Sequence, residues 1–303
     1  MNQVYLDSAR LLTRVAPLVL VDDTFALKGG TAINLFVRDM PRLSVDLDLV
    51  FPDHNLAREE ALRRINGAIR ESGARLRKQG FDTHAPVAAD SGETKLLVRK
   101  DAIQVKIEVN FVMRGTVHPV RRKSLTPAAR EILQADLEVP IVSHEDLYGS
   151  KLVAAMDRQH PRDLFDIVQL FAHEGITADI RRAFVIYLVC HNRPVHEVLF
   201  PPQRDISREF EYSFAGLTAK PVELATLLTA RERMMHELQQ DLSGDERRFL
   251  LSLFTAKPEW SLLRVPHLNQ LPGLRWKLQN LEQLRKTNAR KFAEQSDTLA
   301  RLL

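Results

Sequence analysis

The chain has almost no cysteine and no long apolar run. Its 303 residues include one cysteine, Cys190, which excludes an internal disulfide and any metal site built from several cysteines. No apolar stretch reaches the roughly 18 residues of a membrane-spanning helix. The N-terminus also lacks the basic region, apolar core and small-residue cleavage site of a secretory signal. These absences predict a cytoplasmic protein that has no membrane partner.

Neither sign of charge dominates the composition. Lys and Arg number 43 against 39 Asp and Glu, which gives a net charge of +4 and favours polyanionic partners without demanding one. Basic residues outnumber acidic ones within residues 58–78 and again within residues 274–303. Each cluster is consistent with a nucleic-acid contact and equally with a solvated helix face.

The spacing of apolar residues changes near residue 140. The first part alternates between helical and strand periodicity, which predicts helices and a small mixed sheet. Its expected helices cover residues 1–20, 31–38 and 56–79, and its expected strands cover residues 25–27, 43–51, 95–98 and 103–111. The second part keeps helical spacing, with helices expected from residue 143 to 157 and from 161 to 171. We therefore expect an α+β protein with domains at residues 1–140 and 141–303.

The expected strand at residues 43–51 reads Leu-Ser-Val-Asp-Leu-Asp-Leu-Val-Phe. Its alternation puts Asp46 and Asp48 on one face, about 7 Å apart at the backbone, so both carboxylates can reach one cation. Two anions about 5 Å apart repel by roughly 3 kcal/mol at an effective dielectric constant of about 20, and a divalent cation removes that cost. Carboxylates without His or Cys select Mg²⁺ or Mn²⁺. The alternative is a surface strand with solvated acids.

A third carboxylate lies on the expected strand at residues 103–111. There the apolar residues alternate with Lys106, Glu108 and Asn110. If this strand is the neighbour of the acidic strand, Glu108 can join Asp46 and Asp48 in a site for two-metal phosphoryl or nucleotidyl transfer. Otherwise Glu108 is a solvated acid.

Gly29-Gly30-Thr31 stands at an expected turn from strand to helix, one short helix before the acidic strand. Glycines let the backbone approach a phosphate, and the start of a helix offers unpaired N–H groups. The Thr31 hydroxyl can donate to a phosphate oxygen. Ser44 shares the face of Asp46, and Arg42 precedes it, so both could touch a triphosphate. The G-x-x-x-x-G-K-[ST] phosphate-binding pattern is absent.

Two blocks of the sequence resemble the signature of the AbiEii/AbiGii toxin family, a branch of the DNA polymerase β-like nucleotidyltransferase superfamily. The first is Lys-Gly-Gly-Thr-Ala-Ile-Asn-Leu at residues 28–35 with Arg-Leu-Ser-Val-Asp-Leu-Asp-Leu at 42–49. The second is Glu-Asp-Leu-Tyr-Gly-Ser-Lys-Leu at 145–152 with Asp-Arg-Gln-His-Pro-Arg-Asp-Leu-Phe-Asp at 157–166. The blocks match in order and spacing over about residues 25–170.

The resemblance implies a function. Members of this family are the toxic halves of bacterial type IV toxin–antitoxin pairs, several of them linked to phage defence. Characterised relatives add nucleotides to the 3′ ends of tRNAs and so block aminoacylation. By resemblance, we expect a Mg²⁺-dependent or Mn²⁺-dependent enzyme that transfers a nucleotide from a nucleoside triphosphate to tRNA, with an antitoxin protein as partner. The implied fold is an N-terminal polymerase β-like domain followed by a helical domain.

The resemblance also implies roles for individual residues. Gly29, Gly30 and Thr31 would hold phosphates, and Asp46 and Asp48 would hold the metal ions. Lys151 of the second region would bind the triphosphate in the active-site cleft, where Asp163 or Asp166 would act as a base or orient Lys151. The residues alone leave an alternative open for these last three, namely an ion pair that locks two helices together.

Two other functions stay open at this stage. The same chemistry could use a protein hydroxyl or a small molecule as the acceptor. The fold could also be a nucleotide-binding or antitoxin-binding module without turnover.

Overall fold

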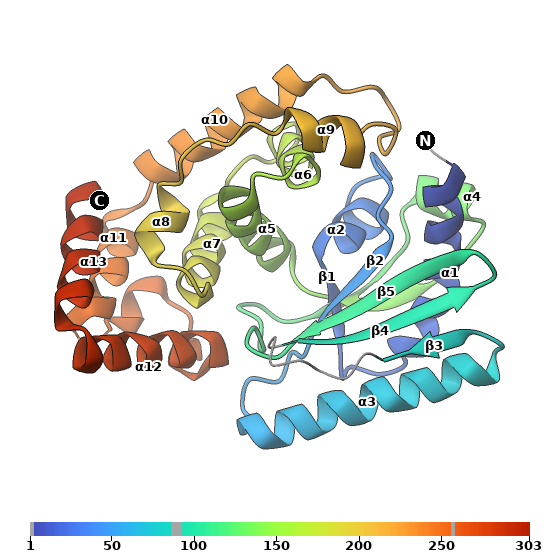
Figure 1. Ribbon diagram of the computed structural model, residues 1–303, viewed down its shortest axis with the longest axis horizontal. Coiled ribbons are helices and arrows are strands. Elements are labelled where there is room, and N and C mark those ends of the chain that lie inside the picture. Colours follow the sequence, from blue (N-terminus) through green and yellow to red (C-terminus); the bar gives the residue numbers. More distant parts are fainter. Residues whose placement is uncertain (1–2, 86–92, 256–257) are drawn as a thin grey trace. The chain divides into compact units, whose positions relative to one another are not determined.

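The computed structural model of the protein describes residues 3–85, 93–255 and 258–303 (Figure 1). It divides into two compact units. Unit 1 comprises Met1–Leu147 and Phe214–Val222, and unit 2 comprises Tyr148–Ser213 and Glu223–Leu303. The chain thus leaves unit 1 near residue 147 and returns to it once, a return that no pattern in the sequence had predicted. In the described part of the chain, no helix combines the length and the apolar character needed to span a membrane.

Unit 1 is built on a mixed sheet of seven strands, which confirms the expected α+β class and exceeds the expected size. The strand order is β3-β4-β5-β2-β1-β7-β6, with β2–β5 and β1–β7 parallel and the other pairs antiparallel. The strands are β1 (Ala26–Lys28), β2 (Asp46–Val50), β3 (Asp82–His84), β4 (Glu93–Lys100), β5 (Ile103–Asn110), β6 (Arg121–Ser124) and β7 (Glu138–Ile141). The strands that the sequence missed are β3, β6 and β7. The first two are short, polar edge strands, which carry no alternating apolar pattern.

Helices cover the apolar side of this sheet. They are α1 (Gln3–Val19) and α3 (Arg58–Lys78), and α4 (Pro127–Leu133) packs on α1. Helix α1 packs on β5 and β2, and α3 packs on β3 and β4, so that α3 runs along the β3 edge in Figure 1. Leu47 and Leu49 of β2 are fully buried, as are Ile107 and Val109 of β5. Burial of these alternate residues leaves the other face of β2 and β5 to polar side chains.

The segment before β2 is held by the part of the chain that returns to unit 1. The strand was expected to begin at residue 43, but β2 begins at Asp46. Instead Arg42 forms an antiparallel bridge with Thr218, and the Leu43 N–H donates to the Leu217 carbonyl at 3.0 Å. Phe214 and Leu217 are buried. The returning segment thereby fixes the backbone that carries Arg42 and leads into the acidic strand.

Unit 2 is helical, as the sequence predicted. Its helices are the greater part of α5 (His144–Arg158), then α6 (Pro161–Phe171), α7 (Ala178–Cys190), α8 (Val195–Leu199), α9 (Ser207–Ser213), α10 (Leu224–Gln240), α11 (Gly244–Ser252), α12 (Pro272–Thr287) and α13 (Ala289–Leu302). Short 3₁₀ turns occupy Leu253–Thr255, Trp260–Leu263 and Leu268–Gln270. Gly149 lets α5 approach α7 closely, since a Cβ there would lie 2.7 Å from the Cβ of Ala183.

The start of α5 is fixed by Asp146. Its backbone N–H donates to the Ser143 hydroxyl at 3.0 Å, which is one half of a capping box. The fully buried Asp146 carboxylate accepts from the backbone N–H groups of Val117 and His118 at 2.8 and 2.9 Å. This carboxylate therefore ties the loop after β5 to the first turn of α5.

Candidate active site

Asp46, Asp48 and Glu108 lie on one face of two neighbouring strands. The parallel register of β2 and β5 pairs Asp46 with Lys106 and Asp48 with Glu108. Residues paired in this way point to the same side of a sheet. The structure therefore brings Asp48 and Glu108 side by side, with Asp46 two residues away, and all three side chains are partly exposed.

The Gly-Gly turn packs directly against this face. Gly29 has a φ of +73°, and a Cβ at this position would lie 2.5 Å from Oδ2 of Asp48. A Cβ on Gly30 would lie 2.7 Å from Nη2 of Arg42 and 3.0 Å from Oγ of Ser44. A side chain at either position would displace these groups, and Gly29 also has a left-handed backbone that favours glycine. The turn from β1 into helix α2 (Gly29–Ala32) gathers the residues expected to bind phosphates.

Thr31 connects this turn to the acidic strand. Its side chain is buried, and its hydroxyl lies 2.5 Å from the Asp46 carbonyl oxygen and 3.0 Å from the Ser44 hydroxyl. The buried Asn34 amide donates to the Gly30 carbonyl at 2.9 Å, although the sequence did not indicate Asn34 as a site residue. A polar residue between the apolar Ile33 and Leu35 was the available signal. In this structure Thr31 and Asn34 hold the turn in place, and the expected bond from Thr31 to a phosphate stays a prediction.

The contacts of Gly29 predict a large effect of one added methyl group. We expect Gly29→Ala to lower the rate of nucleotidyl transfer about a hundredfold, because the Cβ displaces the Asp48 carboxylate. Gly175→Ala is the matched control, since Gly175 also has a positive φ, +68°, and no described atom lies within 4 Å of the place its Cβ would take. Both variants carry backbone strain of about 1–2 kcal/mol, so their melting temperatures should fall alike. Equal transfer rates for the two variants would contradict the predicted role of the Gly29–Asp48 contact.

Two lysines bind the Glu108 carboxylate. Lys95 Nζ lies 3.1 Å from Oε1 and Lys106 Nζ lies 3.0 Å from Oε2. Burial acts to raise the pKa of Glu108, but the bonds to Lys106 and Lys95 outweigh it and lower the pKa. Burial likewise acts to lower the pKa of Lys106, and the bond to Glu108 together with the charges of Asp46, Glu108 and Asp48 raises it. The carboxylates of this face therefore stabilise the charged form of Lys106.

The two aspartates fit a divalent metal ion with hard-oxygen preference. Within residues 3–85, 93–255 and 258–303, no group of three or more His, Cys, Asp or Glu side chains is arranged to hold a metal ion. Mg²⁺, however, usually takes one or two carboxylates and completes its shell with substrate phosphates and water. Asp46 and Asp48 meet that requirement on one strand face. The predicted role of Glu108 as a third ligand stays a prediction, and its oxygens are bound by lysines here.

Unit 2 contains a second cluster of expected site residues. Lys151 Nζ of α5 lies 3.1 Å from Oδ1 of Asp163 and 2.9 Å from Oδ2 of Asp166, both on α6. All three side chains are buried, and Asp163 also pairs with the exposed Arg158 at 2.8 Å. Burial acts to raise the pKa of Asp163, but Lys151 and Arg158 outweigh it and lower the pKa. The sequence left the acceptor of Lys151 open between a phosphate and these aspartates, and here the aspartates bind it.

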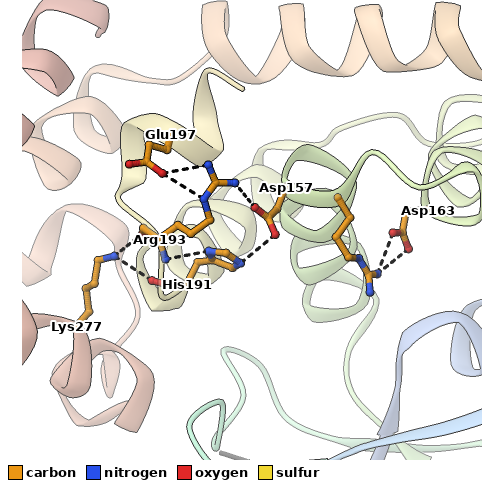
Figure 2. A network of polar contacts seen from close by, with 7 residues as sticks. Asp157, Asp163, His191, Arg193, Glu197 and Lys277 are labelled. Carbon is orange, nitrogen blue, oxygen red and sulfur yellow. Dashed lines mark hydrogen bonds and ion pairs between the residues drawn. The ribbon is translucent and has the colours of Figure 1, made fainter. Parts of the chain in front are cut away.

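A polar network holds the end of α5 beside this cluster (Figure 2). Asp157 accepts from Arg193 Nη1 at 2.5 Å and lies 3.6 Å from Nε2 of His191. Arg193 also pairs with Glu197 at 3.0 Å. The residue after Asp157 is Arg158, the partner of Asp163, so the network fixes the helix turn from which Arg158 reaches Asp163.

Lys277 of α12 binds the loop between α7 and α8, which carries His191 and Arg193, as Figure 2 shows. Its ammonium donates to the carbonyl oxygens of His191 at 2.9 Å and Arg193 at 2.6 Å. Burial lowers the pKa of Lys277 to about 8. This residue belongs to the basic cluster within residues 274–303, yet it is buried because α12 packs on α7. Lys277 thus adds nothing to a basic surface.

The sequence profile of the family described as nucleotidyl transferase AbiEii toxin, type IV toxin–antitoxin system, matches residues 10–280. The chain belongs to the AbiEii family. The resemblance inferred from the glycine turn and the acidic strand is thereby confirmed, as is the transferase class. The AbiEii activity implies a nucleoside triphosphate as substrate.

A solved structure supports the AbiEii fold. The chain is similar to "MenT4, nucleotidyltransferase toxin Rv2826c from Mycobacterium tuberculosis H37Rv", with a TM-score of 0.60 and 18% sequence identity. The match covers 91% of this chain and 94% of that one. At this identity the likeness shows the fold alone. No curated protein sequence matches the chain.

Proposed function

We propose that this AbiEii protein transfers a nucleoside monophosphate from a nucleoside triphosphate to the 3′ end of tRNA and so blocks translation. The observation that supports the proposal is the close approach of Gly29 to the Asp48 carboxylate, because the turn proposed to bind phosphate then lies beside the acidic pair. The family membership supports the transfer reaction. An antitoxin encoded with the toxin is the expected protein partner.

The residues of unit 1 suit the first half of this reaction. The backbone N–H groups of Gly29 and Gly30, with the Arg42 guanidinium, would hold the triphosphate, and Ser44 would add a hydroxyl donor. Asp46 and Asp48 would hold Mg²⁺ or Mn²⁺, which supplies charge neutralisation for the attacking oxygen and the departing pyrophosphate when bound. The acceptor hydroxyl attacks the α-phosphate, the bond to pyrophosphate breaks, and a carboxylate takes the hydroxyl proton.

The roles proposed for unit 2 rest on the sequence motif. Lys151 would neutralise the triphosphate, and Asp163 or Asp166 would be the base or orient the lysine. Their ion pairs fix the Lys151 ammonium at a defined position on α5. The two buried aspartates thereby hold this lysine in place.

Support for tRNA as acceptor comes from the family resemblance and from the basic residues of α3. Arg63 and Arg64 are exposed on this helix, although both pair with Glu60. Exposed arginines on one helix are suited to phosphate contacts along an RNA backbone.

The proposal is tested by label transfer. Purified protein is incubated with each α-labelled nucleoside triphosphate, Mg²⁺ and total tRNA, and a parallel sample uses tRNA whose 3′ diol has been destroyed by periodate. We expect one or more nucleotides to label intact tRNA and none to label oxidised tRNA. Label on oxidised tRNA would exclude the 3′ end as the acceptor. RNase-resistant label on protein from a cell lysate would favour a protein acceptor instead.

A further inference from the structure

A lysine stands among the acids of the proposed metal site. Lys106 is the register partner of Asp46 in the parallel pair β2–β5, and it shares a face of β5 with Glu108. Its ammonium bonds to Oε2 of Glu108 at 3.0 Å, which holds the side chain over this face. The charges of Asp46 and Asp48 also act on it. A cation of the protein therefore lies on the strand face that carries the proposed metal ligands.

The position of this ammonium has an electrostatic consequence. A positive charge a few ångströms from a divalent ion repels it, and carboxylates that already face an ammonium gain less from a metal. We propose that Lys106 is the built-in counter-ion of the Asp46–Asp48 pair and competes with the divalent metal ion for it. This inference rests on the proposed function, because it assigns Asp46 and Asp48 as the metal ligands. It predicts a weak affinity for free metal, so that the ion arrives together with the triphosphate.

Lys95 provides the comparison that separates a local competitor from a general charge effect. It binds the other oxygen of Glu108 at 3.1 Å and is similarly exposed, 41% against 36% for Lys106. It lies on β4, however, and β5 separates β4 from the acidic strand β2. The two lysines thus share one partner and one charge and differ in their distance from Asp46 and Asp48.

The test is the affinity for Mn²⁺ without nucleotide, measured by electron paramagnetic resonance titration at one pH. We expect Lys106→Met to tighten Mn²⁺ binding about tenfold, which corresponds to about 1.4 kcal/mol. Lys106→Arg, which keeps the charge, should stay within about twofold of the wild type. Lys95→Met should tighten binding by no more than about twofold. Lys106→Gln offers a second neutral side chain and should act like Lys106→Met.

Two outcomes would overturn the inference. One is an unchanged affinity in both neutral variants of Lys106, and the other is an equal gain in Lys95→Met, which would make the effect one of net charge. A failure of the proposed metal site gives a different result, because Mn²⁺ binding would then be indifferent to Asp48→Asn in the wild-type and Lys106→Met backgrounds alike. Loss of binding in Asp48→Asn with no change in Lys106→Met would overturn only the role of Lys106.

Discussion

Asp48→Asn lowers the rate of nucleotidyl transfer about a thousandfold in our expectation, while the protein keeps its fold. The asparagine retains the shape of the side chain beside Gly29 but loses the charge that holds a divalent ion. Removing one preorganised charge from a phosphoryl-transfer site typically lowers turnover by about 10²–10³, and loss of metal adds to this. The carboxylate is partly exposed and faces other acids, so its removal should not destabilise the sheet.

The measurement is the initial rate of label transfer to tRNA at saturating nucleotide and Mg²⁺, with a thermal melt of each variant. Asp82→Asn is the matched control, because Asp82 is an exposed aspartate on the edge strand β3 of the same sheet. It should transfer label at the wild-type rate. A rate for Asp48→Asn within tenfold of the wild type would rule out Asp48 as a metal ligand, and a lowered melting temperature would point to a structural role instead.

The parts of the site that the sequence could predict are those that depend on neighbours in the chain. Strand alternation put Asp46 and Asp48 on one face, and the Gly-Gly pair marked the turn at the end of β1. The sequence left open whether β2 and β5 are neighbours, and the structure pairs them with Asp48 opposite Glu108. What the sequence could not predict was that Lys95 is the second partner of Glu108, because Lys95 comes from a third strand.

The features that escaped prediction depend on contacts between distant segments. The return of residues 214–222 to unit 1 rests on backbone bonds to residues 41 and 43, and backbone bonds leave no trace in side-chain periodicity. Gln159 has a φ of +52° between α5 and α6 and donates to the Pro202 carbonyl at 2.8 Å. Its side chain also accepts from the Arg204 N–H at 3.0 Å. Gln159 is also fully buried, and a glutamine in a polar stretch of sequence does not predict such burial.

The Lys151 cluster predicts the largest change in stability. We expect Lys151→Met to lower the free energy of unfolding at pH 7 by about 3–5 kcal/mol, because it removes the ammonium that two buried carboxylates share. Methionine conserves most of the volume, so packing changes little. Lys286→Met is the control, since the exposed Lys286 pairs only across the surface with Glu282 and should cost under about 1 kcal/mol.

The stability difference between the wild type and Lys151→Met should depend on pH. In the wild type the pKa of Asp163 is lowered, so its contribution to stability is present above the unfolded pKa near 3.8 and is lost as the pH falls through the folded pKa. In Lys151→Met the ammonium is gone and burial should raise the carboxylate pKa values. That variant then gains stability relative to the wild type as the pH falls from 7 towards 4. Urea unfolding at pH 7 and pH 4.5 should show a smaller difference between the two proteins at the lower pH.

A triple variant decides whether charge is the cause. Lys151→Met combined with Asp163→Asn and Asp166→Asn removes the buried charges together, and an intact set of neutral groups is tolerated far better than a broken ion pair. We expect it to recover at least half of the stability that Lys151→Met loses. If the triple variant is less stable than Lys151→Met, the stability that Lys151→Met loses comes from packing of the lysine stem along α5. It then does not come from the charge of the two aspartates. A difference between wild type and Lys151→Met that does not change with pH would point the same way, because only ionised aspartates make the loss depend on pH.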